Sequence, residues 1–241
     1  MVLALDCGNT QLKLGVFAGQ QMITRQMIAY GEVLSALQEL QMAYPELQQA
    51  ILSSVGRIPV EIQQYLRVTY ETTTVDRHMK FPFTSRYKTP ETLGTDRMVL
   101  AASACYQYPG QNVLIIDAGT CITYDFKTET ETYLGGAIAP GLQLRYKSLN
   151  DHTANLPLLI PSFPQSVVGR STEESIHSGV LMGTVFEIEG VIQHYCNSYG
   201  SVVVILTGGD GEFLAKRLKS TIFANSNFLL EGLNYLLAFN T

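Results

Sequence analysis

The feature that most constrains this chain is a pattern that occurs twice: an apolar strand ends in Asp-x-Gly, turns back, and is followed by two more strand-like segments. In the first copy, residues 2–5 are apolar, the turn DCGNT occupies residues 6–10, and apolar and polar residues alternate over 12–16. This alternation has the period of a half-buried strand, and Gly and Asn suit a tight turn because they tolerate positive φ. We therefore predict a hairpin, followed by a third strand at 22–28.

The second copy repeats this order about a hundred residues later in the chain. Residues 112–116 are apolar and β-branched, DAGT follows at residues 117–120, and further strand-like segments cover 121–126 and 133–138. Two matching copies of a strand–turn–strand–strand unit indicate a duplicated α/β domain in which each half contains its own β-sheet.

The boundary between the halves is predicted at the PGQ stretch of residues 109–111, because Pro and Gly interrupt regular structure. The predicted domains are therefore 1–110 and 111–241. Residues 69–94 are expected to be irregular, since they contain several Thr, Pro and Gly residues. Thr95 is predicted as the N-cap of the next helix. Further helices are expected at 33–42, 59–66, 142–150 and 172–197, and further strands at 50–55 and 202–206.

Composition excludes several classes of protein. Hydrophobic residues make up 46% of the 241 residues and charged residues 15%, which is typical of a folded domain and not of a disordered chain. The net charge is −5 and no Lys/Arg block stands out, so nucleic acid is not expected as a partner. No apolar run reaches the roughly 20 residues of a membrane span. The four cysteines lack metal-ligand spacing, so free thiols and a soluble, cytoplasmic protein without membrane partners are expected.

The two Asp-x-Gly turns have a chemistry in common. Backbone N–H groups of a tight turn can cradle phosphate oxygens, and an Asp at the end of a strand can hold a cation or its hydration water. One such turn is more often ordinary hairpin chemistry. Two copies favour a pair of domains that close on a nucleotide from both sides. The TGGDG segment at residues 207–211 follows an apolar strand, and its adjacent glycines would let the backbone approach a ligand closely.

Phosphoryl transfer to an alcohol also needs a base beside the acceptor hydroxyl. Asp96, within the LGTDR segment at residues 93–97, is the candidate base, because it is expected in the first turn of a helix, where a carboxylate is well placed. Simple stabilisation of the helix start is the alternative interpretation. Arg97 could hold an acidic group of a substrate through a bidentate contact, and a surface ion pair with Glu91 is the alternative there.

At these residues the sequence resembles the type III pantothenate kinases, which catalyse the first step of coenzyme A biosynthesis. The resemblance covers nearly the whole chain. The order and spacing of the shared motifs are more specific than any single motif. The motifs that carry it are DCGNT, Tyr87 and Pro90 before LGTDR, IDAGTCITYDF, LGGAIAPGL at 134–142 and TGGDG.

The resemblance implies two actin-like (ribonuclease H-like) domains with a nucleotide cleft between them, a homodimer, and ATP, Mg²⁺ and a monovalent cation (K⁺ or NH₄⁺) as cofactors. It implies that Asp96 accepts the proton of the pantothenate hydroxyl, that Asp117 binds the monovalent cation, and that Asp6 binds magnesium directly or through water. The residues that it places at ATP are Asp6, Cys7, Gly8, Asn9, Thr10, Gln11, Leu12, Lys13, Thr120, Gly208 and Gly209. Those that it places at pantothenate are Tyr87, Gly94, Thr95, Asp96, Arg97 and Thr172, the last from the dimer partner.

Two other functions remain open from the residues alone. The same fold could phosphorylate another small acceptor, such as a sugar or a carboxylic acid. A non-catalytic regulatory homologue is the second alternative, although the presence of both Asp96 and Asp117 favours an enzyme.

Overall fold

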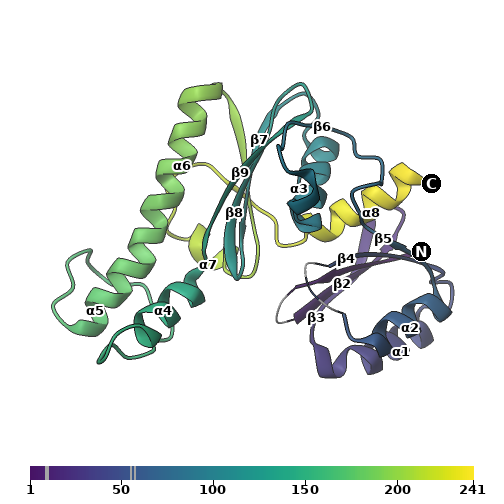
Figure 1. Ribbon diagram of the computed structural model, residues 1–241, viewed down its shortest axis with the longest axis horizontal. Coiled ribbons are helices and arrows are strands. Elements are labelled where there is room, and N and C mark those ends of the chain that lie inside the picture. Colours follow the sequence, from purple (N-terminus) through teal and green to yellow (C-terminus); the bar gives the residue numbers. More distant parts are fainter. Residues whose placement is uncertain (9–10, 55, 57) are drawn as a thin grey trace. The chain divides into compact units, whose positions relative to one another are not determined.

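The computed structural model describes residues 1–8, 11–54, 56 and 58–241. These residues form two compact units, which we describe separately. The first contains residues 1–110, 131–134 and 227–241, and the second contains 111–130 and 135–226. Figure 1 shows the elements of both units with the labels used below.

The first unit is built on a five-stranded sheet with the order β3-β2-β1-β4-β5. β1 pairs with β2 antiparallel and with β4 parallel, so it lies at the centre and is apolar along most of its length. The strands are β1 (Val2–Cys7), β2 (Gln11–Ala18), β3 (Gln21–Ala29), β4 (Gln49–Ser54) and β5 (Glu71–Thr74).

Helices cover both faces of this first sheet (Figure 1). The two amphipathic helices α1 and α2 contact each other and the edge strands β3 and β5, while α8 contacts β1, β2 and β4 and also packs along α3. Buried Leu, Ile and Val side chains from the sheet and from α1 and α2 form a continuous apolar core. The helices are α1 (Val33–Ala43), α2 (Val60–Thr69), α3 (Thr95–Gln107) and α8 (Phe228–Asn240).

The second unit contains the sheet order β11-β10-β7-β8-β9, to which β6 adds at the end. β7 pairs with β8 antiparallel and with β10 parallel. The first residues of β9, Thr132 and Tyr133, belong to the first unit together with β6, with which they pair. The strands are β6 (Thr84–Ser85), β7 (Asn112–Ala118), β8 (Cys121–Lys127), β9 (Thr132–Pro140), β10 (Val202–Thr207) and β11 (Phe223–Ala224).

Helices of the second unit follow β9 and β10. α6 contacts β7 and β10, and α7 contacts β10 and β11. A π-helical stretch, Ser178–Met182, joins α5 to α6, so the helix expected at 172–197 is nearly continuous but irregular in its middle. The helices are α4 (Leu142–Asp151), α5 (Thr172–His177), α6 (Gly183–Tyr199) and α7 (Gly211–Ala215).

The two sheets confirm the duplication that the sequence predicts. In each, a central strand that ends in Asp-x-Gly pairs antiparallel with the next strand and parallel with a later one, which gives the matching orders β3-β2-β1-β4-β5 and β9-β8-β7-β10-β11. Residues 1–110 form one segment of the first unit, and the second unit begins at Gln111. The last helix differs: α8 belongs to the first unit, where it contacts α3 and β1, and its apolar residues, Leu229 and Leu233 among them, are buried.

Two local predictions need correction. Residues 69–94 are not irregular throughout, since the Thr-rich segment Glu71–Thr74 pairs parallel with β4 as β5. The N-cap of α3 is Gly94 and not Thr95, which is already the first helical residue. The Thr95 hydroxyl bonds instead to Ser53 and Ser54, so it is not available to cap its own helix.

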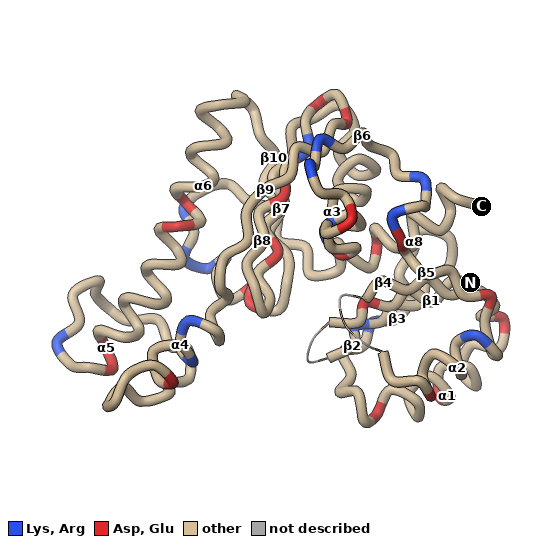
Figure 2. Tube along the Cα trace, viewed as in Figure 1, with Lys and Arg blue, Asp and Glu red and all other residues tan. Residues whose placement is uncertain are grey.

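Charge along the described chain is mixed, with Lys and Arg interspersed among Asp and Glu (Figure 2). None of the helices formed by the described residues combines the length and the apolar character that a membrane span needs. All four cysteines are free thiols, as expected.

Candidate active site

The first carboxylate loop starts at the buried end of β1. Asp6 lies opposite Lys13 in the β1–β2 register, and the Lys13 ammonium is 3.8 Å from Asp6 Oδ2. Asp6 is only 7% exposed. Burial raises the pKa of Asp6 from 3.8 to about 6, Lys13 lowers it, and the nearby charge of Asp96 raises it further. Asp6, Lys13 and Asp96 therefore lie close enough for their charges to interact.

The carbonyl of Gly8 is held by a residue outside the motif. The Tyr30 hydroxyl donates a hydrogen bond of 2.6 Å to Gly8 O. Cys7 is buried in the apolar core, and burial raises its thiol pKa to about 12. The next residues, Asn9 and Thr10, lie outside the described residues. Further on, Gln11 is exposed, whereas the Leu12 side chain is fully buried.

Asp96 is placed by the start of α3. Its Oδ1 accepts a 2.9 Å hydrogen bond from the Arg97 backbone N–H, and a Cβ on Gly94 would lie 2.4 Å from that same oxygen. Because Gly94 has no side chain, the Asp96 carboxylate has room to lie against the first turn of α3. Burial raises the pKa of Asp96, against the lowering effects of the Arg97 N–H bond and of the Arg97 and Lys13 charges. The environment makes Asp96 a stronger base than an exposed Asp.

Thr95 connects the start of α3 to the end of β4. Its hydroxyl lies 3.0 Å from Ser53 Oγ and donates to the Ser54 carbonyl at 3.3 Å. Ser53 pairs in register with Asp6 across β1 and β4. These bonds bring the LGTDR segment to the Asp6 loop. Neither serine was a predicted site residue, because nothing local in the sequence of β4 indicates a partner forty residues away.

Arg97 and Tyr87, two of the residues that the sequence predicts at the pantothenate site, are in contact. The Arg97 guanidinium lies over the Tyr87 ring, 5.6 Å from its centroid. Arg97 is 5% exposed, which does not fit a surface ion pair with Glu91. Behind them, Tyr133 of β9 is fully buried and its ring lies 6.3 Å from Tyr87 and 5.7 Å from Phe83. Tyr133 was missed because it reaches Tyr87 only through the pairing of β6 with β9.

The second carboxylate loop packs directly against TGGDG. Thr207 pairs with Asp117 across β10 and β7, and the backbone N–H of Asp210 donates to the Ala118 carbonyl at 2.9 Å. A Cβ on Gly208 would lie 2.4 Å from both Asp117 Oδ1 and Ala118 O, and Gly208 has a φ of +93°. Gly208 is therefore required by close backbone approach and by its conformation. Gly209 next to it faces open space.

The same loop is held on its other side by the turn after β9. The Gly141 N–H donates to the Thr120 carbonyl at 3.0 Å, and the Gly119 N–H donates to the Cys121 carbonyl at 3.0 Å. A Cβ on Gly141 would lie 2.2 Å from Gly119 O. In the sequence, Gly141 stands out only as part of the LGGAIAPGL motif, which does not predict the residues that it contacts.

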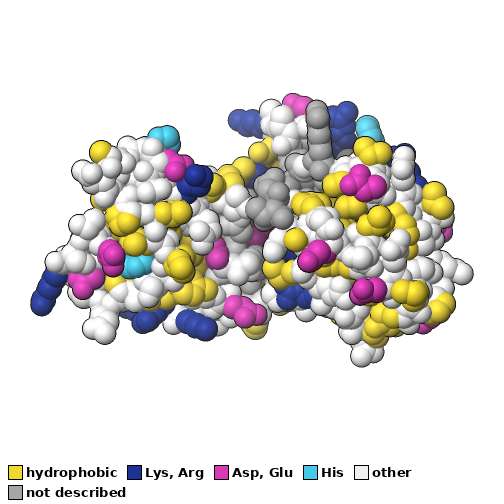
Figure 3. Space-filling view, turned by 90° about the horizontal axis from the view of Figure 1, so that it is seen from below, with side chains coloured by type: hydrophobic (Ala, Val, Ile, Leu, Met, Phe, Trp, Pro, Cys, Tyr) yellow, Lys and Arg dark blue, Asp and Glu magenta, His cyan; other side chains and the backbone are white. Residues whose placement is uncertain are grey.

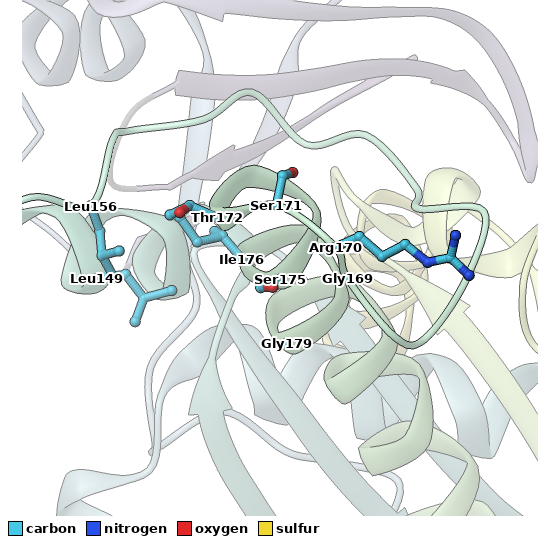
Figure 4. A pocket seen from close by; sticks show the side chains of 9 residues that line it. All are labelled: Leu149, Leu156, Gly169, Arg170, Ser171, Thr172, Ser175, Ile176 and Gly179. Atoms are coloured by element: carbon cyan, nitrogen blue, oxygen red, sulfur yellow. The ribbon is translucent and has the colours of Figure 1, made fainter.

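Thr172 lies elsewhere in the second unit, at the first position of α5. It lines a cavity of about 780 Å³ together with Leu149, Leu156, Ile176 and other residues. Figure 4 shows Thr172 beside these three apolar side chains, while Arg170 extends away from them. The predicted site residues thus fall into a first-unit group around Asp6 and Asp96, a second-unit group around Asp117, and Thr172 at a separate cavity.

Comparison with known proteins decides the family. The family model for type III pantothenate kinase matches residues 2–194. A type III pantothenate kinase from Christiangramia forsetii is 47% identical over 240 residues, covering 100% of this chain and 99% of that protein. One from Flavobacterium johnsoniae is 48% identical over 238 residues, covering 97% and 96%. The chain belongs to the type III pantothenate kinase family.

Membership gives the activity in outline: this pantothenate kinase uses ATP to phosphorylate pantothenate, the first step of coenzyme A biosynthesis. Solved structures agree on the fold. A Campylobacter jejuni protein described as of the Baf family has a TM-score of 0.60 at 21% identity, covering 99% of this chain and 98% of that one. The inorganic polyphosphate/ATP-glucomannokinase from Arthrobacter sp. strain KM has a TM-score of 0.51 at 13% identity, covering 100% and 99%. The expected actin-like α/β fold is confirmed.

Proposed function

We propose that Asp96 is the base of this pantothenate kinase and that the two Asp-x-Gly loops hold ATP. The observation that carries the proposal is the cluster of Asp6, Lys13 and Asp96, in which a carboxylate with a raised pKa lies beside a phosphate-type loop. Asp96 Oδ1 is engaged by the helix N–H, so we assign Oδ2 to the proton of the pantothenate primary hydroxyl. The freed alkoxide then attacks the γ-phosphorus of ATP, giving 4'-phosphopantothenate and ADP.

Pantothenate is an anion, and Arg97 is the cation proposed to receive its carboxylate. Tyr87 covers the guanidinium with its ring, which keeps Arg97 in place and offers an apolar wall with one polar tip. Gly94 and Thr95, at the start of the same helix, complete this side of the proposed site. Arginine suits a carboxylate because its N–H groups can bind both oxygens.

ATP would be held by the first loop, residues 6–13, and by Thr120 of the second, with Gly208 and Gly209 near the adenosine. Asp6 fits Mg²⁺, directly or through water, because a divalent cation would favour the ionised form of a carboxylate that burial and Asp96 disfavour. Among the described residues no group of three or more His, Cys, Asp or Glu side chains could hold a metal. The remaining magnesium ligands would therefore be phosphate oxygens and water, as is usual for this ion.

Asp117 is proposed to bind a monovalent cation, K⁺ or NH₄⁺. It lies at the end of β7 where Gly208 leaves room for its carboxylate, and carbonyl groups of the loop are close by. The cation would offset phosphate charge, which suits a chain without the lysine of a P-loop. Replacing potassium by sodium should strongly reduce turnover, and a rate indifferent to this exchange would remove Asp117 from the role.

We further propose a cytoplasmic homodimer in which Thr172 reaches pantothenate bound by the partner. Several large apolar side chains of the second unit are exposed, including Ile160 and Phe186, and hydrophobic groups are visible on its surface in Figure 3. Mixing Asp96→Asn with Thr172→Arg would test the arrangement. A shared site predicts that each hybrid dimer keeps one intact site and about half of wild-type activity, so an equimolar mixture recovers about a quarter. No recovery from confirmed hybrids would place Thr172 in the site of its own chain.

The substrate is tested by release of ADP in a coupled assay with ATP, magnesium and potassium. Pantothenate should support turnover, whereas a panel of sugars and short carboxylic acids should not. Faster turnover with a member of the panel would favour the alternative of another acceptor. Absence of ADP release with every acceptor, from folded protein, would favour a non-catalytic homologue.

A further inference from the structure

The turn between β9 and α4 packs against the second phosphate loop and supports it. Gly141 donates its N–H to the Thr120 carbonyl, and its lack of a side chain lets the backbone pass close to Gly119 O. Any movement of the Pro140–Gly141 turn therefore moves the loop that we assign to ATP. What fixes this turn matters for nucleotide binding.

Arg145 fixes the turn from one helical turn further along α4. Its Nε donates to the Pro140 carbonyl at 2.8 Å, and its backbone N–H donates to Gly141 O at 3.1 Å. The guanidinium also forms a 2.6 Å ion pair with Glu187 Oε2. Both side chains are partly buried, with exposures of 21% and 30%, so this charge-assisted contact is less screened than one in open solvent.

Glu187 links Arg145 to the strand that leaves the loop. Its other oxygen, Oε1, accepts a 2.7 Å hydrogen bond from the Tyr124 hydroxyl. Tyr124 lies in β8, opposite Ile116 of β7, and is 1% exposed. Burial first, and then the Glu187 contact, raise the pKa of Tyr124 above its usual range, so the hydroxyl stays protonated and keeps donating.

We infer that Arg145, Glu187 and Tyr124 are positioning residues that set the second phosphate loop for ATP. The chain of contacts runs from β8, through α6, to the turn on which Thr120 rests, and so holds the loop from both ends. The inference rests on the proposed assignment of residues 117–120 to ATP. Tyr124, Arg145 and Glu187 lie 4, 25 and 67 positions after Thr120 in the sequence and belong to three different elements, β8, α4 and α6.

The helix that carries Arg145 also carries its matched control. Lys147 forms a 2.7 Å ion pair with Asp151 on α4, but these side chains are 64% and 41% exposed and the pair lies within the one helix. Loss of an exposed pair of this kind changes stability little. Lys147→Met therefore removes a cation from α4 without touching the turn, whereas Arg145→Met removes the cation that holds it.

The experiment measures ATP binding by titration calorimetry without pantothenate, then KM for ATP and for pantothenate, and thermal unfolding, on the full-length protein. For Arg145→Met we expect the Kd and KM of ATP to rise about tenfold, a loss of ~1.4 kcal/mol. The KM of pantothenate should change less than about twofold, and Lys147→Met should match the wild type. Tyr124→Phe should weaken ATP binding about threefold.

Combining Arg145→Met with Tyr124→Phe should weaken ATP binding by less than the product of the single effects, because both act through Glu187. Unchanged ATP binding in both single variants, with only a lower melting temperature, would overturn the inference and leave a structural role. Tyr124→Phe decides the matter if Arg145→Met does not fold. A folded wild type that binds no ATP would instead contradict the ATP assignment itself.

Discussion

Asp6 shows at the scale of a residue how the site conflicts with stability. Its carboxylate is buried 3.8 Å from the Lys13 ammonium, and burial raises its pKa to about 6 despite that cation. A carboxyl group whose pKa is higher in the folded chain than in the unfolded one binds protons more readily when folded. It therefore stabilises the fold at low pH, and this contribution is lost as pH rises through the folded pKa. At neutral pH the ionised form of Asp6 destabilises the free protein.

Asp6→Asn should therefore stabilise the protein at pH 8 while abolishing most activity. The isosteric amide removes the buried charge, and the pKa shift corresponds to a gain of about 1–3 kcal/mol in the free energy of unfolding. The gain should shrink below pH 6 and vanish near pH 4. Urea denaturation at several pH values measures it. Asp151→Asn, at an exposed ion pair, is the control and should change stability by less than about 0.5 kcal/mol. An Asp6→Asn variant less stable than the wild type at pH 8 would contradict this account.

Single residues also mark what the sequence could and could not predict. Asp6, Asp96 and Asp117 were identifiable because each lies in a short motif whose residue types carry the chemistry. Tyr30, Ser53 and Tyr133 were not, since their contacts depend on strand pairing and on chain segments far apart in sequence.

At the scale of elements, the β1–β2 loop depends on a hydroxyl that follows β3. Tyr30→Phe deletes the bond to Gly8 O and should raise the KM of ATP about three- to tenfold, with a loss of about 1 kcal/mol in stability. Tyr70→Phe is a matched control, because its buried hydroxyl has no hydrogen-bond partner among the described residues. That control should leave kinetics unchanged. Equal ATP kinetics in both variants would mean that Gly8 needs no support from Tyr30.

A second prediction at this scale concerns the β9–α4 turn. Gly141→Ala would bring a methyl group within 2.2 Å of Gly119 O, and because the obstacle is backbone the loop must move. We expect ATP binding to weaken more than about tenfold. Gly190→Ala, in α6 with open space around it, should keep full activity and raise stability by about 0.5–1 kcal/mol. Nucleotide titration and thermal unfolding check both, and normal ATP binding by Gly141→Ala would show that the loop does not rest on this turn.

Secondary structure was predictable where hydrophobic periodicity was strong, as in β1, β2, β7 and β10. The prediction was wrong at β5, because a run of polar Thr residues has the sequence character of a loop and forms a strand only by pairing with β4. The cap of α3 was also misassigned, since the Thr95 hydroxyl is drawn to Ser53 and Ser54 by tertiary contacts.

At the scale of the whole molecule, the duplication is clear in the sequence and in the two matching sheets. The membership of α8 in the first unit was not predictable from the order of elements, because an apolar helix at the end of a chain can pack on either half. The halves have also diverged in proposed role: the first provides the base and the magnesium side, and the second provides the monovalent cation and adenosine side.

The most direct test of the central claim is phosphoryl transfer by Asp96→Asn at saturating ATP, pantothenate, magnesium and potassium. The account predicts that kcat falls by a factor on the order of 10²–10⁴ while the Kd of ATP stays within about twofold of the wild type. In the wild type, kcat should decline with falling pH through the raised pKa of Asp96, and this limb should be absent from the variant. A kcat within about tenfold of the wild type would contradict the assignment of Asp96 as the base.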